Sequence, residues 1–232
     1  MNNKKLICFD FETNSVDPYS CDVFQLAAVA IDPIKLEIVP NSLFNSWIKP
    51  DNMERESYYD EYKSTIDWHC KKMGLSKEDF LDKVKNSLPE KIVWEQFIQY
   101  LSNYHDRQNN QNYFSSPIPA GFNIIAFDMP IITRLCKKYK NIQKDGSQGI
   151  FYIRDIKDIL HISTLWLEPI GDLKSFSMDS IRDYVGITQE GGHQAKKDVI
   201  DSAEILIRFL KLHQKLAKNL NFKNSFAQFI TI

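Results

Sequence analysis

Two acidic residues close the first apolar segment of the chain. Asp10 and Glu12 stand at the end of the apolar run 6–11. Alternate side chains of a strand point to the same face, so these two carboxylates would emerge side by side. Two neighbouring anions resist burial unless a cation neutralises them, and carboxylate oxygens suit hard ions such as Mg²⁺ or Mn²⁺. The spacing predicts a divalent metal site, with two solvated acids at a strand end as the alternative.

A third acid, Asp128, follows the segment Gly-Phe-Asn-Ile-Ile-Ala-Phe that begins at Gly121. It falls at the junction between a predicted strand and a predicted helix. A carboxylate at such a junction could meet the first pair at the edge of the sheet. The alternative interpretation is that Asp128 caps the helix whose first turn holds Pro130.

The third group of residues lies near the C-terminal end. Gly191 and Gly192 precede His193, and their backbone freedom would allow the imidazole to sit on a movable loop. Asp198 follows five residues later, on the first turns of the last predicted helix. The alternatives are a surface histidine and an acid that complements the helix N-terminus.

Apolar patterning places these residues on an α/β fold with a mixed sheet and helices on both faces. The first three strands are joined by short links, which predicts an antiparallel meander, and later strands alternate with helices. The predicted strands are 6–11, 23–31, 34–38 continuing into 43–48, 118–122 and 150–153, and the predicted helices are 65–73, 77–84, 93–104, 130–139, 156–167, 178–185 and about 199–216.

Length and composition favour a single folded domain over residues 1–232. Apolar residues make up 43% of the chain and charged residues 25%, which is near the globular average. We expect one domain with a helical and polar-loop insertion at about 50–117. The four cysteines have no disulfide or zinc-site spacing, there is no membrane-spanning run, and the N-terminus lacks a secretory apolar region. These features predict a cytoplasmic protein.

The charge balance limits how the chain could bind nucleic acid. Lys plus Arg number 29 and Asp plus Glu number 30, so the formal net charge is −1. A broad electrostatic grip on phosphates is therefore disfavoured. If the substrate is a nucleic acid, we expect short-range, metal-dependent binding of a few nucleotides, with bases stacking on residues such as Phe11, Val16 or Phe24.

The three groups taken together resemble the DEDD superfamily of 3′-to-5′ exonucleases. The resemblance spans roughly residues 6–210, and the histidine five residues before the last acid is typical of the DEDDh branch, which includes polymerase proofreading subunits and ribonuclease T. The matching motifs are Asp10-Phe11-Glu12-Thr13, then Asn123 with Phe127-Asp128, then His193 with Ala195 and Asp198.

The resemblance implies a ribonuclease-H-like fold with a mixed five-stranded sheet flanked by helices. It implies two Mg²⁺ or Mn²⁺ ions and release of nucleoside 5′-monophosphates from the 3′ ends of single-stranded nucleic acid. Asp10, Glu12, Asp128 and Asp198 would be the metal ligands, and His193 the general base. Thr13, Asn123 and Phe127 would contact the substrate.

Substrate and partners are less defined by the resemblance. Asn14 stands where many members carry glycine after the first acid pair, and Phe122 replaces a frequent histidine. DNA is slightly favoured over RNA, and a polymerase or another replication or repair protein could act as a partner in trans, with no membrane involved. The alternatives are a ribonuclease-H-like endonuclease, which has no need of His193, and a non-catalytic nucleic-acid or polymerase-interaction module.

Overall fold

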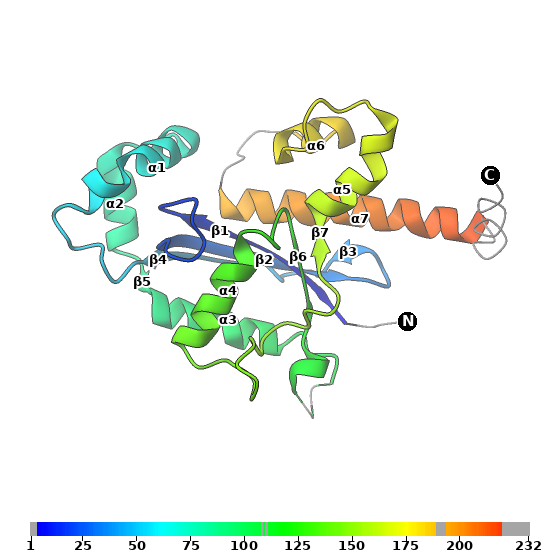
Figure 1. The fold of residues 1–232 in the computed structure, drawn as a ribbon, viewed down its shortest axis with the longest axis horizontal. Helices are drawn as coiled ribbons and strands as arrows, with labels where there is room; N and C mark the ends of the chain where they lie inside the picture. Colours follow the sequence, from blue (N-terminus) through cyan, green and yellow to red (C-terminus); the bar gives the residue numbers. More distant parts are fainter. Residues whose placement is uncertain (1–3, 108, 110, 189–193, 220–232) are drawn as a thin grey trace.

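The computed structural model describes residues 4–107, 109, 111–188 and 194–219. Strands and helices alternate along the chain after an initial run of strands (Figure 1). The strands are β1 (Leu6–Thr13), β2 (Val23–Asp32), β3 (Glu37–Ile38), β4 (Phe44–Lys49), β5 (Leu88–Pro89), β6 (Ile118–Gly121) and β7 (Lys157–Asp158). The helices are α1 (Tyr58–Met73), α2 (Lys77–Lys85), α3 (Glu90–Ser102), α4 (Asp128–Lys138), α5 (Ile159–Leu167), α6 (Met178–Val185) and α7 (Ala195–Asn219), with short 3₁₀ turns η2 (Tyr113–Ser115) and η3 (Glu168–Ile170).

The strands form one mixed sheet in the order β5-β4-β2-β1-β6-β7, with β3 paired to β2. β1 is central, because it pairs antiparallel with β2 and parallel with β6, so that Leu6 lies opposite Ile31 on one side and Ile118 on the other. The predicted meander of the first strands and the mixed sheet with flanking helices are confirmed. The described residues give seven strands rather than five, because the predicted third strand is divided into β3 and β4 and the two-residue strand β5 is added.

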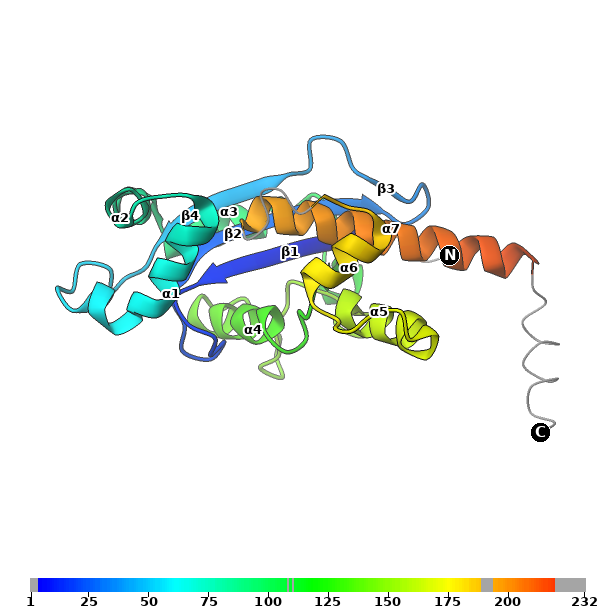
Figure 2. The same cartoon turned by 90° about the horizontal axis from the view of Figure 1, so that it is seen from above.

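The alternation of β1 decides which helices its side chains meet. Ile7, Phe9 and Phe11 pack into a core with α3 and α4, whereas Leu6 and Cys8 pack with α5, α6 and α7. Figure 2 shows α4 and α7 on opposite sides of β1. Asp10 and Glu12 continue the series of Leu6 and Cys8, so the sequence directs both carboxylates to the face that α7 covers.

Helices α1 and α2 form a separate layer beside the end of β1 (Figure 1). Their apolar side chains make a small core with Phe24 of β2, and Ile66 of α1 and Phe80 of α2 are both completely buried in it. Gly74 ends α1 in the left-handed conformation that glycine adopts without strain. The chain between β4 and β5 thus builds a wall at the end of the strand that carries Asp10 and Glu12.

One predicted strand and one helix start are wrong. Residues 150–153 form no strand, because the side chain of Gln148 binds the backbone there: its Oε1 accepts from the N–H groups of Ile150 (2.8 Å) and Phe151 (2.9 Å). These backbone groups are therefore hydrogen-bonded without a neighbouring strand. The strand that pairs with β6 is instead β7. Helix α1 begins at Tyr58, before the predicted residue 65.

The structure bears on the state of the cysteines and on the length and polarity of the helices. All four cysteines are buried and free. Within the described part of the chain, no helix combines the length and the apolar character that crossing a bilayer requires.

Candidate active site

Three carboxylates from two distant parts of the chain meet at the end of β1. Asp10 and Glu12 project from β1, and Asp198 comes from the first turn of α7, which lies over that face of the sheet. One carboxylate oxygen from each residue can be chosen so that all three lie within 4.8 Å of one another. The predicted convergence of these three acids is present, although they are up to 188 positions apart in the sequence.

Asp128 is the fourth predicted acid, and it lies against the same strand. It is the first residue of α4, and its Oδ1 accepts from the backbone N–H of Phe11, between the first two acids, at 3.1 Å. The side chain is buried. Asp128 therefore joins the site from the α4 side of β1.

The turn that delivers Asp128 depends on a glycine and on a buried carboxylate. A Cβ at Gly121 would lie 2.9 Å from the carbonyl oxygen of Phe9, and Gly121 has φ +157°. Asp158, which the sequence analysis missed, accepts from the N–H groups of Asn123 (3.1 Å) and Ile125 (2.9 Å). Asp158 is buried and also caps α5. The predicted helix 156–167 already contains Asp158, so no sequence signal marked this role.

Burial and, for Asp10 and Glu12, repulsion between the acids raise the pKa values of Asp10, Glu12 and Asp128. Burial, followed by the charges of Asp198 and Asp128, raises the pKa of Glu12 to about 8. Burial also raises the pKa of Asp128 to about 8, against the opposing effect of its backbone hydrogen bonds. The pKa of Asp10 is well above its ordinary value, because of burial and then the charges of the other three acids. The site favours a neutralising species, either protons or a cation.

The donor set fits a hard divalent cation. Asp10, Glu12 and Asp198 offer only carboxylate oxygens, the ligand type that Mg²⁺ and Mn²⁺ prefer, and the raised pKa values of Asp10 and Glu12 show that these two anions lack sufficient compensation. Asp128 would add a fourth carboxylate. His193, the predicted general base, lies outside the described residues.

The perturbed acids predict a pH-dependent stability. In the metal-free folded protein Glu12 and Asp128 hold protons to about pH 8, whereas in the unfolded chain they lose them near pH 4. The folded state therefore binds more protons, and its stabilisation is complete below about pH 4 and lost as the pH rises towards 8. We expect the Tm in EDTA to fall across this range, as measured by differential scanning calorimetry.

Manganese should reverse this loss. Because Mn²⁺ binds the deprotonated acids, at about 100 times its Kd it should raise the Tm by about 5 to 10 °C at pH 8, and by less at pH 6. Glu12→Gln removes one titrating group and should flatten the metal-free pH profile. An identical fall of Tm in wild type and Glu12→Gln would contradict the assignment of the perturbed acid.

A buried arginine of α6 pairs with Asp198 and with two further acids on α6 and α7. Arg182 of α6 has 1% of its surface exposed, and its Nη2 donates to Asp198. Its Nε donates to Asp201 at 2.8 Å and its Nη1 to Asp179 at 3.0 Å. Asp201 also pairs with Lys197. This arginine is a site residue that the sequence analysis missed, since one arginine in a short amphipathic helix gives no distinctive signal.

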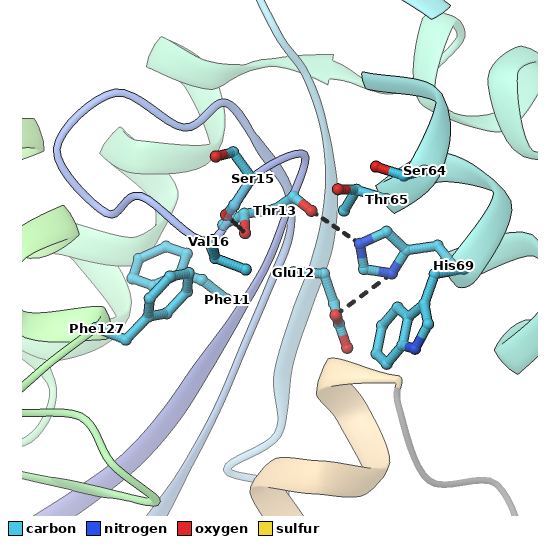
Figure 3. A pocket seen from close by; sticks show the side chains of 10 residues that line it. Phe11, Glu12, Thr13, Ser15, Val16, Ser64, Thr65, His69 and Phe127 are labelled. Atoms are coloured by element: carbon cyan, nitrogen blue, oxygen red, sulfur yellow. Dashed lines mark hydrogen bonds and ion pairs between the residues drawn. The ribbon is translucent and has the colours of Figure 1, made fainter. Parts of the chain in front are cut away.

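His69 of α1 is a second missed neighbour of the site. Its Nε2 lies 2.8 Å from the carbonyl oxygen of Thr13, and its Nδ1 lies 3.6 Å from Oε2 of Glu12 (Figure 3). The ring is buried and stacks against Phe80 of α2. The sequence analysis did not assign His69, and the structure shows that it couples the α1–α2 wall to the end of β1.

A pocket of about 390 Å³ opens beside the acids, between the end of β1 and α1 (Figure 3). Thr13 and Phe127, two of the three predicted substrate residues, line it together with Val16 and Trp68. Val16 is 90% exposed and Trp68 41% exposed, so both offer apolar surface to a ligand. Asn123 does not line this pocket; it occupies a turn with φ +56°.

The residues expected to stack on bases differ in their exposure: Val16 is exposed, whereas Phe11 is almost completely buried in the core. Phe11 and Val16 line the pocket. Phe24 is wrong as a stacking residue, because it is completely buried beneath α1 and α2, with its ring edge against His69 and Phe80.

The fold is similar to that of several solved nucleases. Cell-death related nuclease 4 matches with a TM-score of 0.61 and 18% identity over 90% of this chain and 64% of the other. E. coli exonuclease I in complex with a dT13 oligonucleotide matches with a TM-score of 0.63 and 15% identity over 93% of this chain and 43% of the other. The chain shares the fold of these nucleases. A zinc-bound form of the E. coli exonuclease I complex with single-stranded DNA has a TM-score of 0.59 and 17% identity, covering 89% and 40%.

The similarity lies in structure alone. No protein-family model and no curated protein sequence matches the chain. The chain spans less than two thirds of the length of the three nuclease chains.

Proposed function

We propose that the protein is a metal-dependent 3′-to-5′ exonuclease that releases nucleoside 5′-monophosphates. The observation that carries this proposal is the meeting of carboxylate oxygens of Asp10, Glu12 and Asp198 within 4.8 Å, with Asp128 hydrogen-bonded to the backbone of β1, beside an apolar pocket. The shared fold of solved nucleases supports it.

The four acids would hold two divalent ions. Asp10, Glu12 and Asp198 would hold one, and Asp10 together with Asp128 the other. Bound divalent ions lower the pKa of water and stabilise the entering and leaving oxygens of a phosphodiester. The carboxylates would bind the ions in their deprotonated form.

The pocket favours cutting at an end over cutting within a strand. Its volume of about 390 Å³ is near the lower limit of the ~300–1,000 Å³ that is typical of small-ligand sites, and α1 forms one wall. One terminal nucleoside could stack against Val16, Trp68 or Phe127 while its phosphate reaches the acids. An endonuclease would need the strand to continue through this wall.

His193 would act as the general base. A neutral imidazole can accept the proton of the attacking water, and a positioned general base contributes about 10²- to 10⁴-fold to a rate. We expect His193→Ala to lower kcat by this factor with little change of Tm, measured on a 3′-terminal substrate at pH 8. His161→Ala, at an exposed position on α5, is the matched control. A His193→Ala enzyme as fast as the His161→Ala enzyme would contradict the assignment.

The proposal also covers the preferred nucleic acid, the compartment and the partner. DNA is favoured over RNA, and the similarity to a fold solved with a dT13 oligonucleotide is consistent with this preference. Action in the cytoplasm and association with a polymerase in trans stay predictions from the sequence.

The function is tested with end-labelled oligonucleotides. Single-stranded DNA and RNA, labelled at the 5′ or the 3′ end, are incubated with the protein and Mg²⁺, Mn²⁺ or EDTA. We expect 5′-labelled products that shorten by one nucleotide at a time, immediate release of the 3′ label as a mononucleotide, and no reaction in EDTA. Internal products from both labels would support the endonuclease instead.

A further inference from the structure

A second groove adjoins the candidate active site. Its volume is about 510 Å³, and it lies between the loop after β1 and one face of α4. Six of the residues that line it are Tyr19, Ile125, Met129, Thr133, Arg134 and Lys137.

The groove and the pocket beside the acids are built from the same two segments. In the loop after β1, Val16 lines the pocket and Tyr19 lines the groove. At the start of α4, Phe127 lines the pocket, while Ile125 and Met129 line the groove. A strand whose 3′ end occupies the pocket would therefore meet this groove with the nucleotides that precede the scissile phosphate.

The surface of the groove combines apolar and cationic groups. Tyr19 is 73% exposed and offers an aromatic face on which a base could stack. Lys137 is exposed and forms no ion pair with another described residue. Arg134 donates through Nη2 to the carbonyl oxygen of Cys21 at 2.6 Å, which fixes its guanidinium at the groove. Its Nε is buried and has no hydrogen-bond partner among the described residues.

Two acids oppose this positive charge, because Asp17 and Asp22 both interact electrostatically with Arg134. Asp17 lies in the same loop, and its carboxylate is held by the hydroxyl of Ser20 and the N–H of Tyr19. These two carboxylates offset the charge of Arg134, so Lys137 supplies the cationic group of the groove that lacks an ion pair among the described residues.

The face of α4 sets how far the groove extends. Met129, Thr133 and Lys137 are spaced by four residues, so they share one face of the helix. Lys137 lies nine residues after Asp128, and a rise of 1.5 Å per residue places it about 14 Å further along the axis. At ~3.4 Å per stacked nucleotide, this distance corresponds to about four steps of a single strand.

We propose that this groove binds the nucleotides on the 5′ side of the scissile phosphate, with a base stacked on Tyr19 and a phosphate at Lys137. The proposal rests on the exonuclease function proposed above. It explains how a protein without a net positive charge could retain a single strand: the contact is confined to the approach to the site.

The test compares a substrate that fills the active site alone with substrates that extend into the groove. The first is the p-nitrophenyl ester of thymidine 5′-monophosphate, and the others are oligothymidylates of two to eight nucleotides. For the wild type we expect the KM to fall as the length grows to about five nucleotides and then to level off, since about four steps separate Asp128 from Lys137.

Tyr19→Ala and Lys137→Ala should affect only the longer substrates. We expect Tyr19→Ala to raise the KM of the octanucleotide at least about fivefold, by loss of one stacked base. Lys137→Ala should reduce the slope of log(1/KM) against log[salt] by about 0.7, the value for one single-strand phosphate contact. Neither variant should change hydrolysis of the p-nitrophenyl ester. Lys215→Ala, at an exposed position on α7, is the matched control and should leave the salt slope unchanged.

The outcomes separate this proposal from the proposed function. If the wild type hydrolyses the ester and the oligonucleotides but Tyr19→Ala and Lys137→Ala keep the full length and salt dependence, the groove does not bind the strand. Equal losses on the ester and on the octanucleotide would also overturn the groove, because the substitutions would then act on the active site. If the wild type hydrolyses neither substrate with Mg²⁺ or Mn²⁺, the exonuclease function itself fails.

Discussion

Replacing Asp10 by asparagine is expected to abolish 3′-end hydrolysis. Asp10 adjoins the other acids: burial, and then the charges of Glu12, Asp128 and Asp198, raise its pKa, so it is the group best placed to serve both ions. Loss of a metal ion removes several kcal/mol of transition-state stabilisation, and kcat should fall by at least about 10³-fold.

The same substitution should have the opposite effect on metal-free stability. Because Asp10→Asn removes one of several mutually repelling carboxylates, the Tm in EDTA at pH 8 should rise, while the Tm increase caused by Mn²⁺ should disappear. Asp183→Asn, an exposed acid on α6, should keep both the turnover and the Mn²⁺ response. An Asp10→Asn protein that retains turnover and is still stabilised by Mn²⁺ would remove Asp10 from the site.

The second large effect is expected at Arg182. This guanidinium is buried and pairs with Asp179, Asp198 and Asp201, so its removal takes a neutralising charge away from three carboxylates at once. Breaking a buried ion pair from one side costs about 3–5 kcal/mol, a large part of the ~5–15 kcal/mol that stabilises a typical domain. We expect Arg182→Met to lower the free energy of unfolding by that amount, measured by urea denaturation in EDTA.

A surface pair provides the control for Arg182. Arg55 and Glu61 are 3.0 Å apart with both side chains nearly half exposed, so Arg55→Met should cost less than about 1 kcal/mol. The loss in Arg182→Met should also be smaller in Mn²⁺ than in EDTA, since a divalent ion would neutralise Asp198 in place of the arginine. Equal stabilities of Arg182→Met and Arg55→Met would show that the buried cluster does not stabilise the fold.

The positions of the acids could be anticipated because each follows from a local rule. The two-residue period of a strand is enough to put Asp10 and Glu12 on one face, and the burial of Leu6 and Cys8 on that face identifies it as the face under α7. Asp128 could be placed by the junction of β6 and α4, and Asp198 by the start of α7. Their convergence was predictable from order along the chain and from the family resemblance.

The groups that support the acids could not be anticipated, because their roles depend on tertiary contacts. Nothing local distinguishes Arg182 from a surface arginine, yet the packing of α6 on α7 buries it against Asp198 and Asp201. His69 touches the site only because α1 folds over the end of β1. The wrong prediction of a strand at residues 150–153 also results from a contact that the sequence does not reveal. The pattern of apolar residues there does not indicate that the side chain of Gln148 binds their backbone.

Crystals soaked in MnCl₂ test the central claim most directly. An anomalous difference map recorded at the manganese edge should show ions bound by Asp10, Glu12 and Asp198, with Asp128 contributing to the second of two ions. An Asp10→Asn crystal soaked in the same way should show neither peak. If wild-type crystals bind manganese elsewhere but show no peak among these carboxylates, the protein does not hold the ions that the proposed hydrolysis requires.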